Sequence, residues 1–96
     1  MNANEIKAAQ DNGKIVCIVD VNRTFDLLAT RAAGADVGKL LISQPDNAKQ
    51  AREITESVAR SGVVEIIVIH GTITGWAHAA ILEAAKRFGT EIRFVA

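Results

Sequence analysis

Lys14–Val21 reads KIVCIVDV, and Val63–His70 reads VVEIIVIH. Each stretch contains an unbroken apolar block, Ile15–Val19 in the first and Ile66–Ile69 in the second. A strand whose two faces are both buried has such a continuous pattern, whereas a strand with one solvated face alternates between polar and apolar residues. The two blocks therefore predict two central strands of a parallel sheet that is covered on both faces.

Two other short apolar runs are typical of edge strands. Lys39–Gln44 is short and leads into Pro45, whereas Glu91–Ala96 alternates, with Glu91 and Arg93 placed between apolar residues. Proline and alternating polar residues are tolerated at the edge of a sheet. Because crossovers between parallel strands are right-handed, these positions favour the strand order 2-1-3-4 with helices on both faces.

Helix-period segments fill the intervals between the four runs, whose starts lie roughly 25 residues apart, as in repeated strand–helix units. These segments predict helices at residues 2–12, 24–33, 47–61 and 75–88. Glycines that follow the segments, and polar residues that precede them, are the expected caps. They are Gly13, Gly34, Gly62 and Gly89 at the C-terminal ends, and Asp46, Thr74 and either Thr24 or Asn22 at the N-terminal ends. We therefore expect one α/β domain, residues 1–96, with three layers and a P-loop or Rossmann-like sheet.

The composition limits the classes of partner. Apolar residues make up 49% of the chain, and 11 basic residues balance 11 acidic ones, which gives a formal net charge of zero. A neutral chain has no global field that would attract nucleic acid or an anionic membrane. It also has little charge repulsion to oppose association, so we expect a monomer or weak self-association.

The chain has one cysteine, Cys17, and its place within an apolar block predicts a buried, inert thiol. Residues 1–10 contain no apolar segment of the kind that secretory signals require. No apolar stretch approaches the ~18 residues that cross a bilayer. For a natural protein, these features predict a cytoplasmic location.

The expected ligand site lies beyond the carboxyl ends of the first and third strands, where the winding of an open parallel sheet reverses. The candidate ligand-binding residues there are Asp20, Asn22, His70, Gly71, Thr72 and Thr74. The segment Gly71–Gly75 precedes a helix and could cradle an anion, but it matches neither phosphate-binding glycine motif. Loop capping and turn geometry explain the same residues, so both interpretations stay open.

The sequence contains no complete catalytic constellation. No second histidine, cysteine or carboxylate has metal-ligand spacing with His70, and His78 is expected on the surface. Neither a nucleophile elbow nor a carboxylate pair for acid–base chemistry is present. Trp76 is expected to be a partly buried packing residue, with a ligand or partner contact as the alternative. We therefore expect no enzymatic activity, no metal and no cofactor.

Several stretches of the chain resemble a known family. Leu40–Asp46 reads LLISQPD and Ala59–Gly62 reads ARSG. With Gln50-Ala51, Glu53-Ile54 and Val64–Ile69, they resemble the core ATPase domain of bacterial RecA recombinases. The similarity extends back through Ala8–Gln10, Gly13-Lys14, Val19-Asp20 and residues 26–34, so it covers about residues 6–70. The last helix and strand resemble the family only in pattern. The resemblance implies the same adjacent placement of the four strands.

The chain departs from this family at its functional positions. The position of the family's catalytic glutamate is occupied by Asn22, that of its metal-linked aspartate by His70, and that of the adenine-packing aromatic by Ala29. The chain begins within the helix that follows the family's phosphate loop, so we expect that loop to be absent. About twenty residues join the third strand to the fourth, which is too few for the family's DNA-binding loops. The resemblance therefore implies the scaffold and argues against ATP hydrolysis, strand exchange and filament assembly.

The leading hypothesis is an engineered or designed stand-alone domain without catalytic activity. Clean helix caps and core patterning combined with missing functional residues favour it. One alternative is a binding module for a phosphate-bearing or nucleotide-like ligand at the carboxyl ends of the first and third strands. The other alternative is an interaction domain that assembles through an exposed edge or through Trp76.

Overall fold

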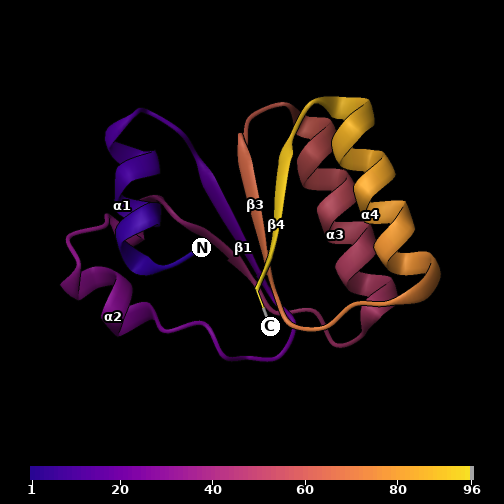
Figure 1. Ribbon diagram of the computed structural model, residues 1–96, viewed down its shortest axis with the longest axis horizontal. Helices are drawn as coiled ribbons and strands as arrows, with labels where there is room; N and C mark the ends of the chain where they lie inside the picture. Colours follow the sequence, from indigo (N-terminus) through magenta and orange to yellow (C-terminus); the bar gives the residue numbers. More distant parts are fainter. Residues whose placement is uncertain (96) are drawn as a thin grey trace.

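Helices cover both faces of a four-stranded parallel sheet in the computed structural model of this protein, which describes residues 1–95 (Figure 1). In chain order the elements are α1 (Ala3–Asp11), β1 (Val16–Asp20), α2 (Leu27–Ala32), the 3-10 helix η1 (Val37–Lys39), β2 (Leu41–Ser43), α3 (Ala48–Ser61), β3 (Ile66–His70), α4 (Gly75–Phe88) and β4 (Glu91–Val95). The strand order is β2-β1-β3-β4, which confirms the predicted α/β class and topology. Ala96, the last residue of the predicted edge strand, lies outside the described residues.

β1 and β3 form the centre of the sheet, as the unbroken apolar blocks predict. The register pairs Val16 with Ile66 at one end and Asp20 with His70 at the other. All five residues of β1 and the first four of β3 are buried. Because both strands end at the same level, the polar residues that terminate them are neighbours at the carboxyl edge.

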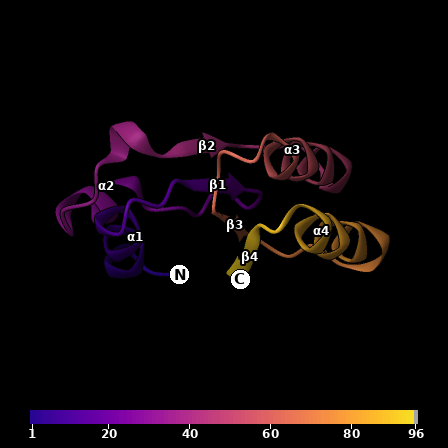
Figure 2. The ribbon, with the colours of Figure 1, turned by 90° about the horizontal axis from the view of Figure 1, so that it is seen from above.

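The central strands point their side chains alternately toward two helical layers. Cys17, Val19, Ile67 and Ile69 share one core with α3 and α4, whereas Val16, Ile18, Ile66 and Val68 share the other with α1. Figure 1 shows α1 and α2 on one side of the sheet and α3 and α4 on the other, and Figure 2 shows the same layers from above. The sheet is therefore covered on both faces, as predicted.

Small residues line the buried faces of the two long helices. Ala51, Thr55 and Ala59 are buried on α3, and Ala77, Ile81, Ala84 and Ala85 are buried on α4. Side chains four residues apart lie on one helix face, so each series forms a stripe that packs against the sheet. All four glycines predicted at helix ends have positive φ, as a left-handed cap requires.

The helix that follows β1 begins later than the predicted residue 24. Asp26 caps α2 by accepting the N–H of Ala29 at 2.9 Å. The N–H groups of Thr24 and Phe25 instead donate to the Asp20 carboxylate, which holds this segment outside the helix. The predicted caps Thr24 and Asn22 are therefore wrong, because a strand-end carboxylate competes for the amides.

Two further boundaries differ from the sequence prediction. Asn47, and not Asp46, caps α3 by accepting the N–H of Gln50 at 2.9 Å, while the N–H of Asp46 donates to the Gln50 side chain. The predicted edge strand from Lys39 begins at Leu41, because residues 37–39 form η1. Thr74 is the N-cap residue of α4 as predicted, although its side chain makes no capping hydrogen bond.

Cys17 is buried as predicted, and burial raises the pKa of its thiol to about 11. A thiol with so high a pKa carries little thiolate at neutral pH and is a poor nucleophile. None of the helices within residues 1–95 combines the length and apolar character that a bilayer crossing demands.

Truncation of a central-strand side chain tests this packing. Ile67 is fully buried, whereas Leu28 is 77% exposed. We expect Ile67→Ala to lower the free energy of unfolding by about 2–5 kcal/mol, because it removes apolar contacts and leaves a cavity. Leu28→Ala is the matched control and should change it by no more than about 0.5 kcal/mol. Urea denaturation measures both, and equal costs would contradict the assignment of β3 to the core.

Candidate functional site

Asp20 ends β1 and organises the loop that follows it. Its side chain is buried, one carboxylate oxygen accepts the N–H groups of Thr24 at 3.0 Å and Phe25 at 3.2 Å, and the other accepts that of Phe25 at 3.3 Å. Burial of a carboxylate is tolerated when such donors compensate for lost hydration. Asp20 therefore closes a turn, which is the structural role that the sequence left as its alternative.

His70 ends β3 beside Asp20 and packs against the same loop. Its ring lies edge-on to that of Phe25, with 5.5 Å between the ring centroids. Burial lowers the pKa of the His70 imidazole below its ordinary value, and the Asp20 carboxylate opposes this shift. The Nδ1 atom is buried without a hydrogen-bond partner among the described residues. The neutral imidazole is thus the form that this site favours.

Asn22 and Gly71 bring the loops after β1 and β3 into contact. The N–H of Asn22 donates to the carbonyl of His70 at 3.1 Å, and the N–H of Gly71 donates to that of Val95 at 2.7 Å. Gly71 has φ +140, and a Cβ at this position would lie 2.8 Å from both the Asn22 Oδ1 and the Val21 Cβ. Only glycine fits this approach without displacement of its neighbours.

The predicted anion cradle at Gly71–Gly75 is partly exposed. Thr72 and Thr74 face solvent, while Ile73 between them is 6% exposed and belongs to the core of α3 and α4. Residues 71–75 contain only glycine, threonine and isoleucine, so the segment offers an anion no charged side chain. Among the predicted site residues, the fold brings Asp20, Asn22, His70 and Gly71 together, and it leaves the two threonines at the start of α4.

A small hollow of about 160 Å³ lies at this carboxyl edge. It is lined by Met1, Asn2, Ala3 and Ile6 from the start of α1, by His70, and by Thr24, Phe25, Asp26, Ala29 and Thr30. Only His70 among the predicted site residues contributes to it. The sequence missed Phe25 and the N-terminal residues, because their approach depends on tertiary packing and not on a local motif.

Apart from the His70 Nδ1, the Asn2 and Asp26 side chains at this hollow have structural partners. The Asn2 side chain accepts the N–H of Glu5, and the Glu5 side chain accepts the N–H of Asn2, so a capping box closes the start of α1. The Asp26 side chain caps α2 by accepting the N–H of Ala29, without a reciprocal bond. Within residues 1–95, no three His, Cys, Asp or Glu side chains gather as a metal site would require.

Trp76 is 63% exposed, so the prediction of a partly buried packing residue is wrong. The neighbouring Ala77 occupies the buried face of α4, and consecutive helix residues point in different directions. The indole instead lies beside Arg52 of α3, whose guanidinium carbon is 5.5 Å from the ring centroid. His78, expected on the surface, is half-buried, with its ring centroid 4.6 Å from that of Phe94.

Comparison with protein families and curated proteins gives a consistent result. The family described as the RecA N-terminal domain matches residues 1–89. The chain is 47% identical over 64 residues to Protein RecA of Chlorobaculum tepidum and 44% identical over 64 residues to that of Clostridioides difficile. Each alignment covers 67% of this chain and 18% of the relative, so the chain spans about a fifth of the length of these proteins. The identities support a RecA-derived segment, and none of them supports a designed origin.

A solved structure shares the fold over nearly the whole chain. The crystal structure of SulA from Pseudomonas aeruginosa superposes with a TM-score of 0.71 and covers 97% of this chain and 78% of the SulA chain. The sequence identity is 17%, so this likeness concerns the fold alone.

Substitution of Gly71 tests the contact between the two loops. We expect Gly71→Ala to cost about 2–4 kcal/mol of stability, because an alanine would be strained at this φ and would collide with Asn22. Gly62→Ala is the control, since Gly62 also has positive φ but nothing lies within 4 Å of the added Cβ. Its cost should be about 1 kcal/mol. Thermal denaturation compares the two, and equal losses would refute the close approach.

The lowered pKa of His70 predicts a specific dependence of stability on pH. Below pH 6.5, the ordinary value, the unfolded chain binds a proton that the folded His70 resists. Stability should therefore be full above this pH and fall as the pH drops toward the folded pKa. His70→Gln should flatten this part of the profile, with His78→Gln as the matched control. Unfolding followed between pH 5 and 8 measures it, and an unchanged profile for His70→Gln would contradict the assignment.

Proposed function

The chain belongs to the RecA N-terminal domain family, and we propose that it keeps the scaffold of this family and does not hydrolyse ATP. The main support for this proposal is the set of polar side chains at the carboxyl edge of β1 and β3. There the one buried carboxylate, Asp20, is committed to the N–H groups of Thr24 and Phe25. The residues beside it, Asn22 and His70, supply an amide and an imidazole.

The chemistry of phosphoryl transfer explains why this edge argues against hydrolysis. Mg²⁺ prefers oxygen ligands, and P-loop nucleoside triphosphatases hold it partly through an aspartate at the end of a strand. The position that resembles this aspartate is His70, a nitrogen ligand that packs against Phe25. The position that resembles the catalytic glutamate is Asn22, whose amide cannot accept a proton from water at neutral pH. Both departures lie inside the chain, so they do not depend on where it begins or ends.

The space at this edge supports the same proposal. The hollow of about 160 Å³ is smaller than the roughly 300–1,000 Å³ of typical small-molecule sites. The capping box of α1 and the Asp26 cap of α2, both at its border, give the N–H groups of Glu5 and Ala29 internal partners. The sheet of the family is thus combined with an Asp20 that is engaged in a turn, and with Asn22 and His70 at the positions that resemble the family's two functional carboxylates.

A hydrolysis assay with a matched site variant tests this proposal. Purified chain incubated with ATP and Mg²⁺ should release phosphate at the rate of the blank. The paired variant Asn22→Ala/His70→Ala should behave identically, because neither residue contributes to turnover. Phosphate release that purifies with the chain and disappears in the paired variant would contradict the proposal.

A further inference from the structure

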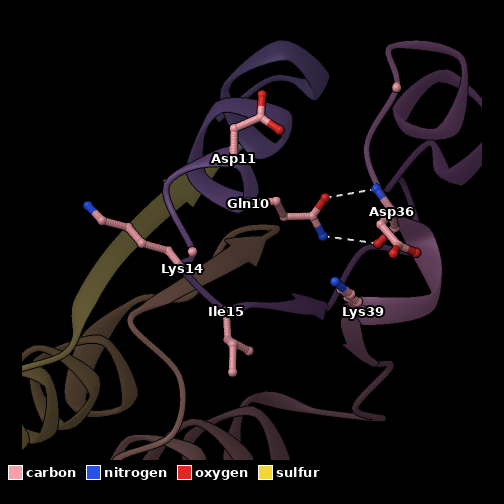
Figure 3. A pocket seen from close by; sticks show the side chains of 8 residues that line it. Gln10, Asp11, Lys14, Ile15, Asp36 and Lys39 are labelled. Carbon is pink, nitrogen blue, oxygen red and sulfur yellow. Dashed lines mark hydrogen bonds between the residues drawn. The ribbon is translucent and has the colours of Figure 1, made fainter.

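A larger hollow lies at the opposite, amino-terminal edge of the sheet (Figure 3). Its volume is about 400 Å³, within the range of small-molecule sites. One wall comes from the end of α1 and the turn into β1, and the other comes from the loop between α2 and β2. The lining residues are Gln10, Asp11, Gly13, Lys14, Ile15, Gly34, Asp36 and Lys39.

The two walls are fixed to each other by Gln10. Its side-chain N–H donates to the carbonyl of Asp36 at 3.0 Å, and its side-chain oxygen accepts the N–H of Asp36 at 2.8 Å. Figure 3 shows this pair of hydrogen bonds crossing between the walls. A side-chain amide that uses both of its groups on one backbone residue restrains the gap before any ligand enters.

The charged side chains that line this hollow differ in whether they form an ion pair. Asp11 pairs with Lys7 at 2.7 Å, and one oxygen of Asp36 accepts the N–H of Gly38 at 3.1 Å. Lys14 and Lys39 form no ion pair within the described part of the chain and are both exposed. Asp36 keeps its negative charge despite this hydrogen bond and has no ion pair within residues 1–95 either. The unpaired charges of the lining are therefore two ammonium groups and one carboxylate, and their sum is positive.

The two lysines stand on different walls. Lys14 leads into β1, and Lys39 ends η1 just before β2. In Figure 3 the Lys39 ammonium group is turned toward Gln10, whereas the exposed Lys14 side chain starts from the other rim and extends away from Gln10. Ile15, which is 37% exposed, adds an apolar surface beneath them. Two cations on facing walls match a ligand that carries more than one negative charge.

We propose that this hollow binds a small diphosphate-bearing anion, with Lys14 and Lys39 supplying the charge and Gln10 holding the walls. Lysine binds phosphate as a point charge, so flexible side chains on two walls can adjust to the separation of two phosphate groups. The proposal does not rest on the absence of ATP hydrolysis, because this edge lies across the sheet from Asn22 and His70.

The test uses pyrophosphate as the probe and backbone amide NMR as the readout. Pyrophosphate should shift the resonances of Gly13, Lys14, Gly34 and Lys39 in a saturable manner, and the binding should weaken as salt is added. The paired variant Lys14→Ala/Lys39→Ala should bind pyrophosphate at least about ten-fold more weakly than the parent chain. Both lysines are exposed, so the variant should fold as the parent does.

Matched variants separate this site from general attraction to lysine. Lys49→Ala/Lys86→Ala removes two exposed lysines from α3 and α4 and should leave pyrophosphate binding unchanged. Gln10→Leu keeps the charge but breaks the clasp, and it should weaken binding. Absence of saturable shifts at millimolar pyrophosphate would overturn the proposal. So would equal losses in the two lysine pairs, or shifts confined to residues 70–75.

Discussion

The pairing of β1 with β3 is the constraint on which the rest of this structure depends. The two strands run side by side from Val16 and Ile66 to Asp20 and His70, and nearly every side chain between these ends is buried. A parallel pair covered on both faces needs helices on both sides, which α1 on one face and α3 with α4 on the other provide (Figure 2). The edge strands β2 and β4 each pair with one of these two central strands, β2 with β1 and β4 with β3.

The same pairing determines the chemistry of the two ends of the sheet. At the carboxyl edge, register places Asp20 beside His70, and hydrogen bonds from Asn22 and Gly71 extend the association beyond the strands. These polar groups stabilise turns and neighbouring loops. At the amino edge, the chain turns into β1 and β2 through loops that Gln10 holds together, and two lysines there have no such structural partner. These two lysines lie at the edge opposite the one where open parallel sheets usually bind ligands.

The features that the sequence predicted are those with a local or periodic cause. Strand centrality follows from the unbroken blocks Ile15–Val19 and Ile66–Ile69, and the helix ends follow from glycines with positive φ. The start of α2 was missed because the Asp20 carboxylate captures the amides of Thr24 and Phe25, a competition that no helix pattern contains.

Of the candidate sites, the features that follow from strand order could be predicted, and those that depend on tertiary packing could not. The neighbourhood of Asp20 and His70 could be predicted, since both end central strands that run in parallel. The role of Asp20 in a turn and the exposure of Trp76 depend on packing that the sequence does not display. The hollow at the amino edge was not foreseen, because its clasp joins Gln10 to Asp36 across 26 residues without a recognisable motif.

Native-state hydrogen exchange tests the central claim most directly, because it resolves the stability of each strand. If β1 and β3 hold the molecule together, the amides of Cys17–Val19 and Ile67–Ile69 will exchange only through global unfolding. Their exchange free energy will then equal that from denaturation, whereas amides of the short edge strand β2 will exchange with a lower value. Exchange of the central amides through local openings, at free energies well below global unfolding, would contradict this account.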